Sequence, residues 1–281
     1  MRLGLLHTTI REEEKLLLAA ARDFNVEIDA VDVRGVVLNP VWRRDSYDLV
    51  LERCVCTTIG SHAAMFFEMM GTKVVNSLQV AANCENKMRT SLLFHQFNIP
   101  TPPFALAFTE DEAKRAVEQL GGYPVVLKPV SGSWGRLLAK VNDEDALEAV
   151  VEQKMVLGSP AQKPLYLQKY YQKKGRDIRV AVVGDRVPSA IHRYCPHWIT
   201  NMARGARAEN CPVDDEMRRI ALRASVAVGG GFLGVDLFET EEGYLVNEVN
   251  HIPEFKNVQR VTGVNIAREV ISYCLEVVAK C

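Results

Sequence analysis

Two carboxylates and an amide near the end of the chain could meet on one face of a hairpin. They are Asp236, Glu248 and Asn250. Such an all-oxygen set suits Mg²⁺, which keeps several waters and usually shares phosphate oxygens with a substrate, and it does not suit zinc. Like charges directly opposite each other destabilise a hairpin, so an aspartate that faces a glutamate needs open water or a cation. The alternative is a solvated strand face, although Asp and Asn are poor strand formers and stand here among Val, Leu and Phe.

The hairpin itself is predicted from local sequence. Two runs with strand character flank a three-residue loop that ends in Gly243. A loop of this length is a known hairpin connection in which the glycine takes a left-handed bulge position. Pairing Thr240 with Tyr244 then places Asp236 opposite Glu248, and the amide of the set lies two residues further along the same face.

A second group of candidates lies in the middle of the chain. Lys128 interrupts the short apolar strand VVLKPV, and a buried lysine should have an anionic partner because a lone buried charge is costly. The following loop, 131–136 (SGSWGR), is small and glycine-rich, so its N–H groups could bend over phosphate oxygens. Its spacing is not that of a Walker A motif, and a plain hairpin loop would look much the same. The glycines Gly229, Gly231 and Gly234 end a helix and precede a strand, which is the reverse of a dinucleotide-binding context.

Charged side chains also mark a predicted pair of strands in the last third of the chain. Asp177 and Arg179 share a face of the first strand, and Arg193 lies on the return strand. Solvated surface arginines are the alternative for each of them. Together with the lysines, the glycine-rich loop and the acidic hairpin, they are the parts needed to position a nucleoside triphosphate and neutralise its transferred phosphoryl group.

Composition describes an ordinary globular chain with no signal for nucleic acid or membrane. The 281 residues are 48% hydrophobic and 25% charged, with a net charge of −1. No apolar run approaches the roughly 20 residues that span a bilayer, and the start turns acidic too soon for a secretory signal, so we expect a cytoplasmic protein. The seven cysteines lack paired C-x-x-C spacing, which predicts reduced thiols.

The order of strands and helices predicts three domains. Apolar strands alternate with helices over the first part, which indicates a parallel sheet with crossover helices, and no glycine-rich loop follows its first strand. A proline-rich linker then leads to mixed strands and helices, one of which Asn142 could cap. The expected fold class is α/β with mixed α+β parts, in domains of residues 1–84, 85–165 and 166–281.

The motifs and their order resemble a known family. VVLKP, SGSWGR, RDIRV and the D…NEVN hairpin resemble the ATP-grasp carboxylate–amine ligases, in the branch of the ribosomal-protein glutamate ligase RimK. LKPVSGSWGRLLAKV, HWITN-x-ARG, AENCP and EFKN are of the LysX type within that family. The resemblance covers essentially the whole chain. It implies an ATP-grasp fold in which an N-terminal parallel-sheet pre-ATP-grasp domain precedes two α+β domains that enclose ATP.

The resemblance also assigns roles to single residues. It implies that Arg179 and Arg193 contact the reacting groups and that Asp236, Glu248 and Asn250 bind Mg²⁺. It implies that two lysines and the glycine-rich loop hold the phosphates, and that a linker segment faces adenine. The implied ATP-binding residues are Lys87, Lys128, Gly132, Ser133, Trp134, Gly135, Arg136, Gln168, Lys169, Tyr170, Asp177, Arg179, Arg193 and Asn201.

The implied reaction is ATP-dependent amide formation in lysine biosynthesis. In this type of enzyme, the γ-carboxyl of the last glutamate of a small acidic amino-group carrier protein, LysW, is activated as an acyl phosphate, and the α-amino group of α-aminoadipate displaces phosphate. The resemblance further suggests a homo-oligomer. Alternatives are glutamate as the acceptor in arginine biosynthesis, a ribosomal-protein tail as the donor, and a nucleotide-binding regulator without turnover.

Acceptor choice is predicted from two positions. In the resembled group, Asn after EFK accompanies α-aminoadipate and Gly-Phe at that place accompanies glutamate, so Asn257 and Val258 favour the longer acid. Lys256 or Arg260 could pair with the distal carboxylate. The alternative is that the asparagine only satisfies a turn.

Overall fold

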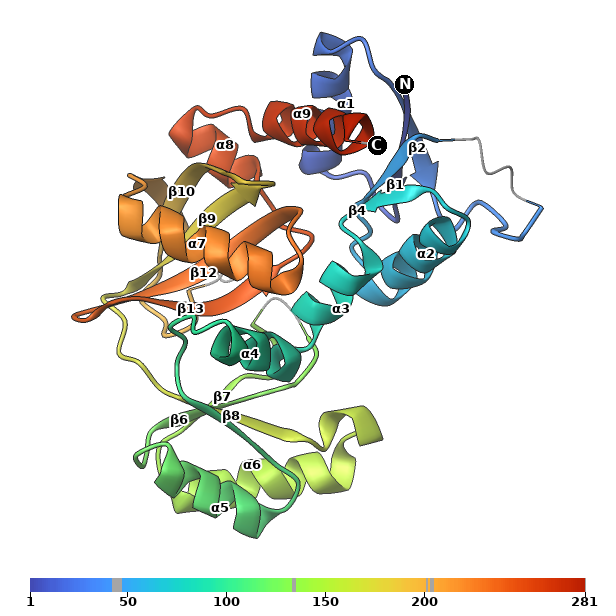
Figure 1. Cartoon of the computed structure of the whole chain (residues 1–281). Coiled ribbons are helices and arrows are strands. Elements are labelled where there is room, and N and C mark those ends of the chain that lie inside the picture. Colours follow the sequence, from blue (N-terminus) through green and yellow to red (C-terminus); the bar gives the residue numbers. More distant parts are fainter. Residues whose placement is uncertain (42–46, 133–134, 201, 203–204, 281) are drawn as a thin grey trace.

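Figure 1 shows three sheets, each with helices packed against it. The computed structural model describes residues 1–41, 47–132, 135–200, 202 and 205–280. The first sheet has the strand order β2-β1-β3-β4 and is parallel throughout, as the alternation of strands and helices predicted. Its strands are short and largely apolar because helices cover a parallel sheet. The elements of this part are β1 (Arg2–His7), α1 (Glu12–Asp23), β2 (Glu27–Asp32), β3 (Leu49–Glu52), α2 (Thr57–Met69), β4 (Lys73–Val75) and α3 (Leu78–Glu85).

The second sheet is antiparallel, with the order β5-β8-β6-β7, and lies at the bottom of Figure 1. Helices α5 and α6 pack on one face of it through Ala113, Leu147 and their apolar neighbours. The expected cap of the second of these helices, Asn142, is wrong by one residue, because Asp143 accepts the hydrogen bond from the N–H of Ala146 at 2.8 Å. The elements here are α4 (Lys87–Gln96), β5 (Phe104–Ala107), α5 (Glu110–Gln119), β6 (Val125–Lys128), β7 (Ala139–Val141), α6 (Glu144–Leu157), a 3₁₀ turn (Pro160–Gln162) and β8 (Leu165–Lys169).

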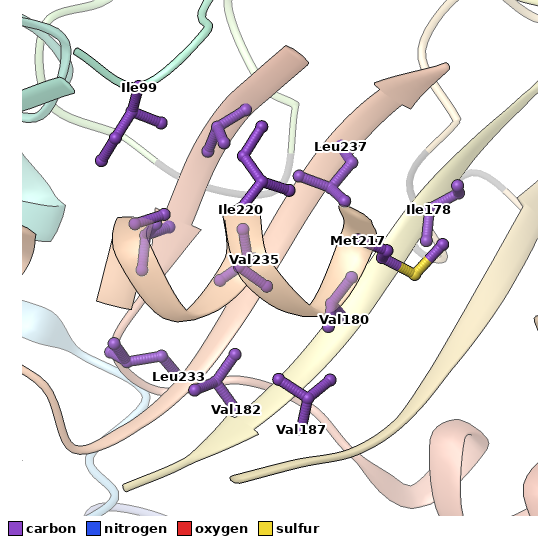
Figure 2. Close-up of a cluster of buried hydrophobic side chains, with 14 of the residues drawn as sticks. Ile99, Ile178, Val180, Val182, Val187, Met217, Ile220, Leu233, Val235 and Leu237 are labelled. Atoms are coloured by element: carbon purple, nitrogen blue, oxygen red, sulfur yellow. The ribbon is translucent and has the colours of Figure 1, made fainter. Parts of the chain in front are cut away.

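The third sheet is the largest and is antiparallel, with the order β11-β10-β9-β12-β13. Helix α7 lies across it, and Figure 2 shows Met217 and Ile220 of this helix over Val180, Val235 and Leu237. The helix ends where Gly229 takes a left-handed conformation. The elements are β9 (Arg176–Val183), β10 (Arg186–Tyr194), β11 (Arg207–Cys211), α7 (Asp215–Val228), β12 (Phe232–Thr240), β13 (Gly243–Asn250), α8 (Lys256–Thr262) and α9 (Ile266–Ala279).

One hydrophobic core joins the two ends of the chain. Leu17 of α1 and Ile271 of α9 belong to the same buried cluster, and the two helices lie side by side at the top of Figure 1. Arg53, 0% exposed, bonds Glu14 at 3.2 Å and the carbonyl of Pro253 at 3.0 Å. The first sheet is therefore tied to the segment that follows β13, which fixes its position over the third sheet.

In the acidic hairpin, formed by β12 and β13, the predicted pairing holds at Asp236 and Glu248 but not at the turn. Thr240 pairs with Gly243, not with Tyr244, so the loop has two residues and the predicted start of the register is wrong by one. A bulge at Asn247 adds one residue to β13, and Asp236 faces Glu248 as predicted. The error at the turn and the extra residue in the strand cancel.

Two expectations from composition can be compared with this part of the chain. Within the described ranges, none of the helices is long and apolar enough to cross a bilayer. The described cysteines are free thiols: Cys54, Cys56, Cys84, Cys195, Cys211 and Cys274.

Candidate active site

Two cavities meet between the sheets. The larger, about 390 Å³, lies between the first and third sheets, and the smaller, about 70 Å³, lies between the second and third. Their common wall is charged and polar and consists of Lys87, Lys128, Gly132, Asn247 and Glu248. A group that reacts at this wall is reachable from both cavities.

Three lysines converge on this region, and each is held by a neutral oxygen. Lys87 donates to the carbonyl of Gly132 at 2.6 Å, and Lys128 donates to Oδ1 of Asn247 at 3.0 Å. Lys173 donates to Oγ1 of Thr200 at 3.0 Å. The hydrogen-bond partner of Lys128 is therefore a neutral amide. The expected anion acts on it by charge alone, because Glu248 raises the pKa of Lys128 against the larger lowering by burial.

The electrostatics of these lysines favour an added anion. Lys128 is 6% exposed, and burial lowers its pKa to about 8. The charges of Lys87 and Lys173 act in the same direction, and those of Glu248 and Asp236 oppose them. Burial also lowers the pKa of Lys173. Cations that lie close together without hydrogen bonds to carboxylates can bind an added anion such as phosphate. Sequence reasoning missed Lys173, because its place in KKGRD gives no sign of burial.

The arginines predicted on β9 and β10 form the opposite arrangement. Arg193 makes two bonds to Asp177, of 2.7 and 2.8 Å, and reaches Asp236 at 3.0 Å. Arg179 also holds Asp236 through both carboxylate oxygens. Burial alone would raise the pKa of Asp236, but the two guanidinium groups outweigh it and lower the pKa to about 2. Thr200 donates to Asp177 and so connects this network to Lys173.

The three predicted metal ligands lie on the hairpin wall. Glu248 and Asn250 line the larger cavity, and Asp236 and Glu248 line the smaller one. From the sequence we argued that Asp236, which faces Glu248, needs water or a cation. In the structure Arg179 and Arg193 are the cations beside Asp236, so a metal is not required for this reason alone. Three of about four acceptor positions of that carboxylate are used, which leaves room for one more bond. Within the described residues, no group of three or more His, Cys, Asp or Glu side chains could hold a metal, so an amide oxygen would have to complete the set.

The smaller cavity combines apolar surface with many of the predicted ATP-binding residues. Val126, Leu138 and Phe238 provide apolar surface, and the predicted linker enters it at the end of β8. The predicted residues that line this cavity are Lys87, Lys128, Gly132, Gly135, Arg136, Gln168, Lys169, Tyr170 and Asp177. Arg179 and Arg193 line the larger cavity instead. Three further predicted residues, Ser133, Trp134 and Asn201, lie outside the described residues.

The far end of the larger cavity contains the predicted specificity positions. Asn257 and Val258, at the start of α8, both line it. Lys256 and Arg260, the candidates for pairing with a distal carboxylate, are not among the described lining residues. Arg11, from the turn before α1, is among them. We did not single it out from the sequence, because the contact that brings α1 to the segment before α8 joins distant parts of the chain.

Solved structures define the class to which this architecture belongs. A RimK-domain ATP-grasp protein from Sphaerobacter thermophilus has a TM-score of 0.78 over 98% of this chain and 100% of that one, at 24% identity. D-alanine–D-alanine ligase from Bacillus anthracis, solved with ATP, has a TM-score of 0.71 over 100% and 98%, at 15% identity. The fold is therefore that of the ATP-grasp ligases.

Family models narrow the class. The model of the RimK-like ATP-grasp domain matches residues 84–274, and the model of the LysX preATP-grasp domain matches residues 3–83. The chain belongs to the RimK-like ATP-grasp family and is an ATP-dependent ligase, as the motifs predicted.

Relatives with two different names are similar to nearly the whole chain. Alpha-aminoadipate–LysW ligase LysX of Saccharolobus solfataricus is 36% identical over 274 residues, which are 96% of this chain and 99% of that protein. Glutamate–LysW ligase ArgX of Sulfurisphaera tokodaii is 32% identical over 279 residues, 98% and 99% of the two chains. The similarity is comparable for both names, so identity alone does not decide between them.

Proposed function

We propose that this chain joins the γ-carboxyl of the C-terminal glutamate of a LysW-type carrier protein to the α-amino group of α-aminoadipate, in lysine biosynthesis. The observation that supports this most is the wall shared by the two cavities, where Lys87 and Lys128 line both, while Arg179 and Arg193 line only the larger. Such a wall lets ATP enter from one side and two organic substrates from the other. Relatives named as LysW ligases support the choice of carrier.

The proposed reaction has two steps, phosphoryl transfer to the carboxylate and then amide formation. A carboxylate oxygen attacks the γ-phosphorus, the bond from this phosphorus to the β,γ-bridging oxygen breaks, and ADP leaves. The acceptor ammonium loses one proton, and the amine then attacks the acyl carbon. The C–O bond to phosphate breaks, and the departing phosphate takes the second proton from nitrogen, which gives the amide and inorganic phosphate. Holding the carboxylate and the amine together makes the second step effectively unimolecular, so the protein needs no Ser, Cys or His nucleophile.

The lysines and arginines have separate tasks in this scheme. Lys87, Lys128 and Lys173 neutralise the phosphates, because their present oxygen partners are neutral and can be exchanged for phosphate oxygens. Arg179 and Arg193 contribute fixed positive charge where the acyl phosphate forms. The smaller cavity, about 70 Å³, is too small for a whole nucleotide, so we infer that the wall at Gly132 moves outward when ATP binds.

We further propose that Asp236, Glu248 and Asn250 hold Mg²⁺. Two carboxylates and an amide match the oxygen ligands that this ion prefers, and Asp236 retains an acceptor position. When bound, the ion would neutralise charge on the phosphates. Glu248→Gln should therefore raise the Mg²⁺ concentration needed for half-maximal ADP release without unfolding the chain. An unchanged Mg²⁺ dependence would remove Glu248 from the set.

The acceptor is the finer part of the proposal. Asn257 and Val258 line the far end of the larger cavity, where an acceptor side chain would lie. α-Aminoadipate and glutamate differ by one methylene, which is worth only about 1–3 kcal/mol in a pocket. Glutamate is the alternative acceptor, supported by the relatives named ArgX.

The deciding measurement is ADP release with ATP, Mg²⁺ and a LysW-type carrier protein, with each amino acid in turn. We expect release to require both carrier and acceptor and to be faster with α-aminoadipate in kcat/KM. Replacing Asn257 and Val258 by Gly and Phe should shift the preference toward glutamate. ADP release at the same rate without the carrier would contradict the ligase proposal. A preference of the wild type for glutamate would contradict only the proposed choice of acceptor.

A further inference from the structure

The described lining of the larger cavity includes an arginine, Arg11, that the ATP and metal sites do not use. Among the described lining residues, Lys87, Lys128, Arg179 and Arg193 lie at or near the hairpin wall. Arg11 comes from the opposite side, from the turn between β1 and α1. It is half-buried, so its charge faces a restricted volume instead of open solvent.

The guanidinium of Arg11 is held in a fixed orientation. Its Nε and Nη2 donate to the two oxygens of Glu14 at 2.9 and 2.7 Å. Glu14 is fully buried and is also held by Arg53 at 3.2 Å. In the part of the chain that the structure describes, Nη1 of Arg11 has no hydrogen-bond partner. A rigid guanidinium with a free N–H edge is suited to a carboxylate, because a second anion can bind without displacing the first.

The adjacent wall also favours a negative charge. Helix α2 begins at this cavity, and Thr57 and Thr58 in its first turn line it. Its N-cap residue, Cys56, makes no side-chain cap, and the first turn contains no acidic residue. The N–H groups at the start of this helix are therefore available to an anion from the cavity.

The same region lies beside the predicted specificity positions. The backbone N–H of Lys256 contacts Glu13 of α1 at 3.4 Å, and Arg53 bonds the carbonyl of Pro253. These contacts hold the segment before α8 against the start of α1, so Arg11 and Asn257 belong to one end of the cavity. Glu254 lines this end as well. Burial lowers the pKa of Arg11, but the bond to Glu14 and the charge of Glu254 help to raise it, which places Glu254 near Arg11.

We propose that Arg11 binds the side-chain carboxylate of the amino-acid acceptor, with the first turn of α2 beside it. This inference rests on the proposed ligase function and adds the group that recognises the acceptor. Glutamate and α-aminoadipate share the side-chain carboxylate and differ in its distance from the amine. Arg11 selects for an acidic side chain, and the residues at the start of α8 select its length. From the sequence we considered Lys256 or Arg260 as the partner of the distal carboxylate. We now assign this role to Arg11, about 245 positions earlier in the chain.

The test varies the acceptor and Arg11 together. Carrier-dependent ADP release is measured with α-aminoadipate and with its analogue in which a primary amide replaces the side-chain carboxylate. Wild type should prefer the acid by about 10- to 100-fold in kcat/KM, the usual value of a hydrogen bond between charged groups. Arg11→Met should lose about this factor for the acid, through KM, and change little for the amide, so that the ratio approaches one. If Arg11 had only a structural role, Arg11→Met would lower kcat/KM equally for the acid and the amide. The ratio of the two values would then stay unchanged, which would overturn the inference.

Two controls separate the outcomes. Arg34→Met removes an exposed arginine that pairs with Asp32 in the same sheet and should leave the ratio at its wild-type value. Trapping the acyl phosphate with hydroxylamine needs ATP and carrier but no acceptor. No hydroxamate from wild type would overturn the proposed function itself, whereas normal trapping with an unchanged ratio in Arg11→Met would overturn only the role of Arg11.

A second variant and a second analogue complete the design. If Arg11→Met fails to fold, Arg11→Lys keeps a charge for Glu14 but lacks the planar fork. For Arg11→Lys, the ratio of kcat/KM for the acid to that for the amide should lie between one and the wild-type value. A ratio equal to that of the wild type would overturn the inference. An analogue with an amide in place of the α-carboxylate keeps its side-chain carboxylate, so Arg11→Met should lower its kcat/KM by the same factor as for α-aminoadipate. Loss of the Arg11 effect with this analogue instead would place the α-carboxylate there and overturn our assignment.

Discussion

The lysines and the arginines of the site differ in what holds their charges. Lys87 and Lys128 bond a carbonyl and an amide oxygen, whereas Arg179 and Arg193 bond the carboxylates of Asp177 and Asp236. Both groups are buried or half-buried within the same site. The lysines of the first group have no hydrogen bond to a carboxylate, whereas each arginine of the second group is hydrogen-bonded to one.

From this difference we expect the lysines to bind the ligand and the arginines to hold the strands in place. A planar guanidinium matches a carboxylate through two bonds, so an Arg–Asp network fixes the geometry of two strands before any substrate arrives. An ammonium held by a neutral oxygen loses little when a phosphate replaces that oxygen. We therefore expect mutations in the arginine group to cost stability first, and mutations in the lysine group to cost nucleotide affinity first.

The largest effect should come from Arg193→Met. Removing this guanidinium leaves Asp177 buried without its cation and takes one of two cations from Asp236, which should lower the free energy of unfolding by about 3–5 kcal/mol. Urea denaturation measures this change. Arg176→Met is the control, because Arg176 pairs with a partly exposed Glu239 and should cost about 1 kcal/mol or less. Equal losses in the two variants would contradict the scaffolding role.

Lys128→Met should show the opposite pattern. The substitution removes a buried charge with no carboxylate bond, so stability should stay the same or increase. Nucleotide affinity should fall about 10- to 100-fold, because a charge-assisted bond to phosphate is lost. Calorimetry with ADP and Mg²⁺, with thermal melting alongside, measures both. In the same domain, Lys114→Met removes a lysine that already bonds three glutamates and should leave ADP binding unchanged.

The lysine group should also make nucleotide binding depend on pH. Burial lowers the pKa of Lys128 from 10.5 to about 8. The unfolded chain keeps this proton up to about pH 10.5, so between pH 8 and 10.5 the folded state holds fewer protons, and stability in wild type rises with pH relative to Lys128→Met. Over the same range the free protein loses the charge that phosphate needs, and ADP affinity should fall by up to about tenfold per pH unit. A decrease of the same size in Lys128→Met would exclude Lys128 as the cause.

The comparison also indicates what the sequence could reveal. Strand periodicity placed Asp177 and Arg179 on one face, and the hairpin pattern placed Asp236 opposite Glu248, because both depend on neighbours a few residues away. The loop length was wrong, since a two-residue and a three-residue connection are both compatible with a glycine at this position. Only the bulge at Asn247 restored the pairing, and nothing local in the sequence marks it.

Long-range contacts were beyond the sequence. The partner of Lys128 comes from Asn247 on another sheet, and Arg11 reaches the site through the packing of α1 against the segment before α8. Periodicity carries no information on such distances. Motif resemblance supplied most of the proposed ATP-binding residues but omitted Lys173, which lies in the charged run KKGRD.

The smallest effect should come from Lys173→Met, which tests whether this residue belongs with the lysines or the arginines. Lys173 bonds Thr200, which in turn bonds Asp177, and it lies 5.0 Å from the ring centre of Phe238. If it serves the nucleotide, the variant should weaken ADP binding by a factor of about 5, near 1 kcal/mol, because a partly solvated cation adds less than a buried one. Stability should change by less than that, since the methionine still packs on Phe238. A loss of stability with unchanged ADP affinity would instead assign Lys173 to the arginine network, joined to it through Thr200. Thr200→Val distinguishes the two routes, because it breaks the link to Asp177 while leaving the lysine charge in place.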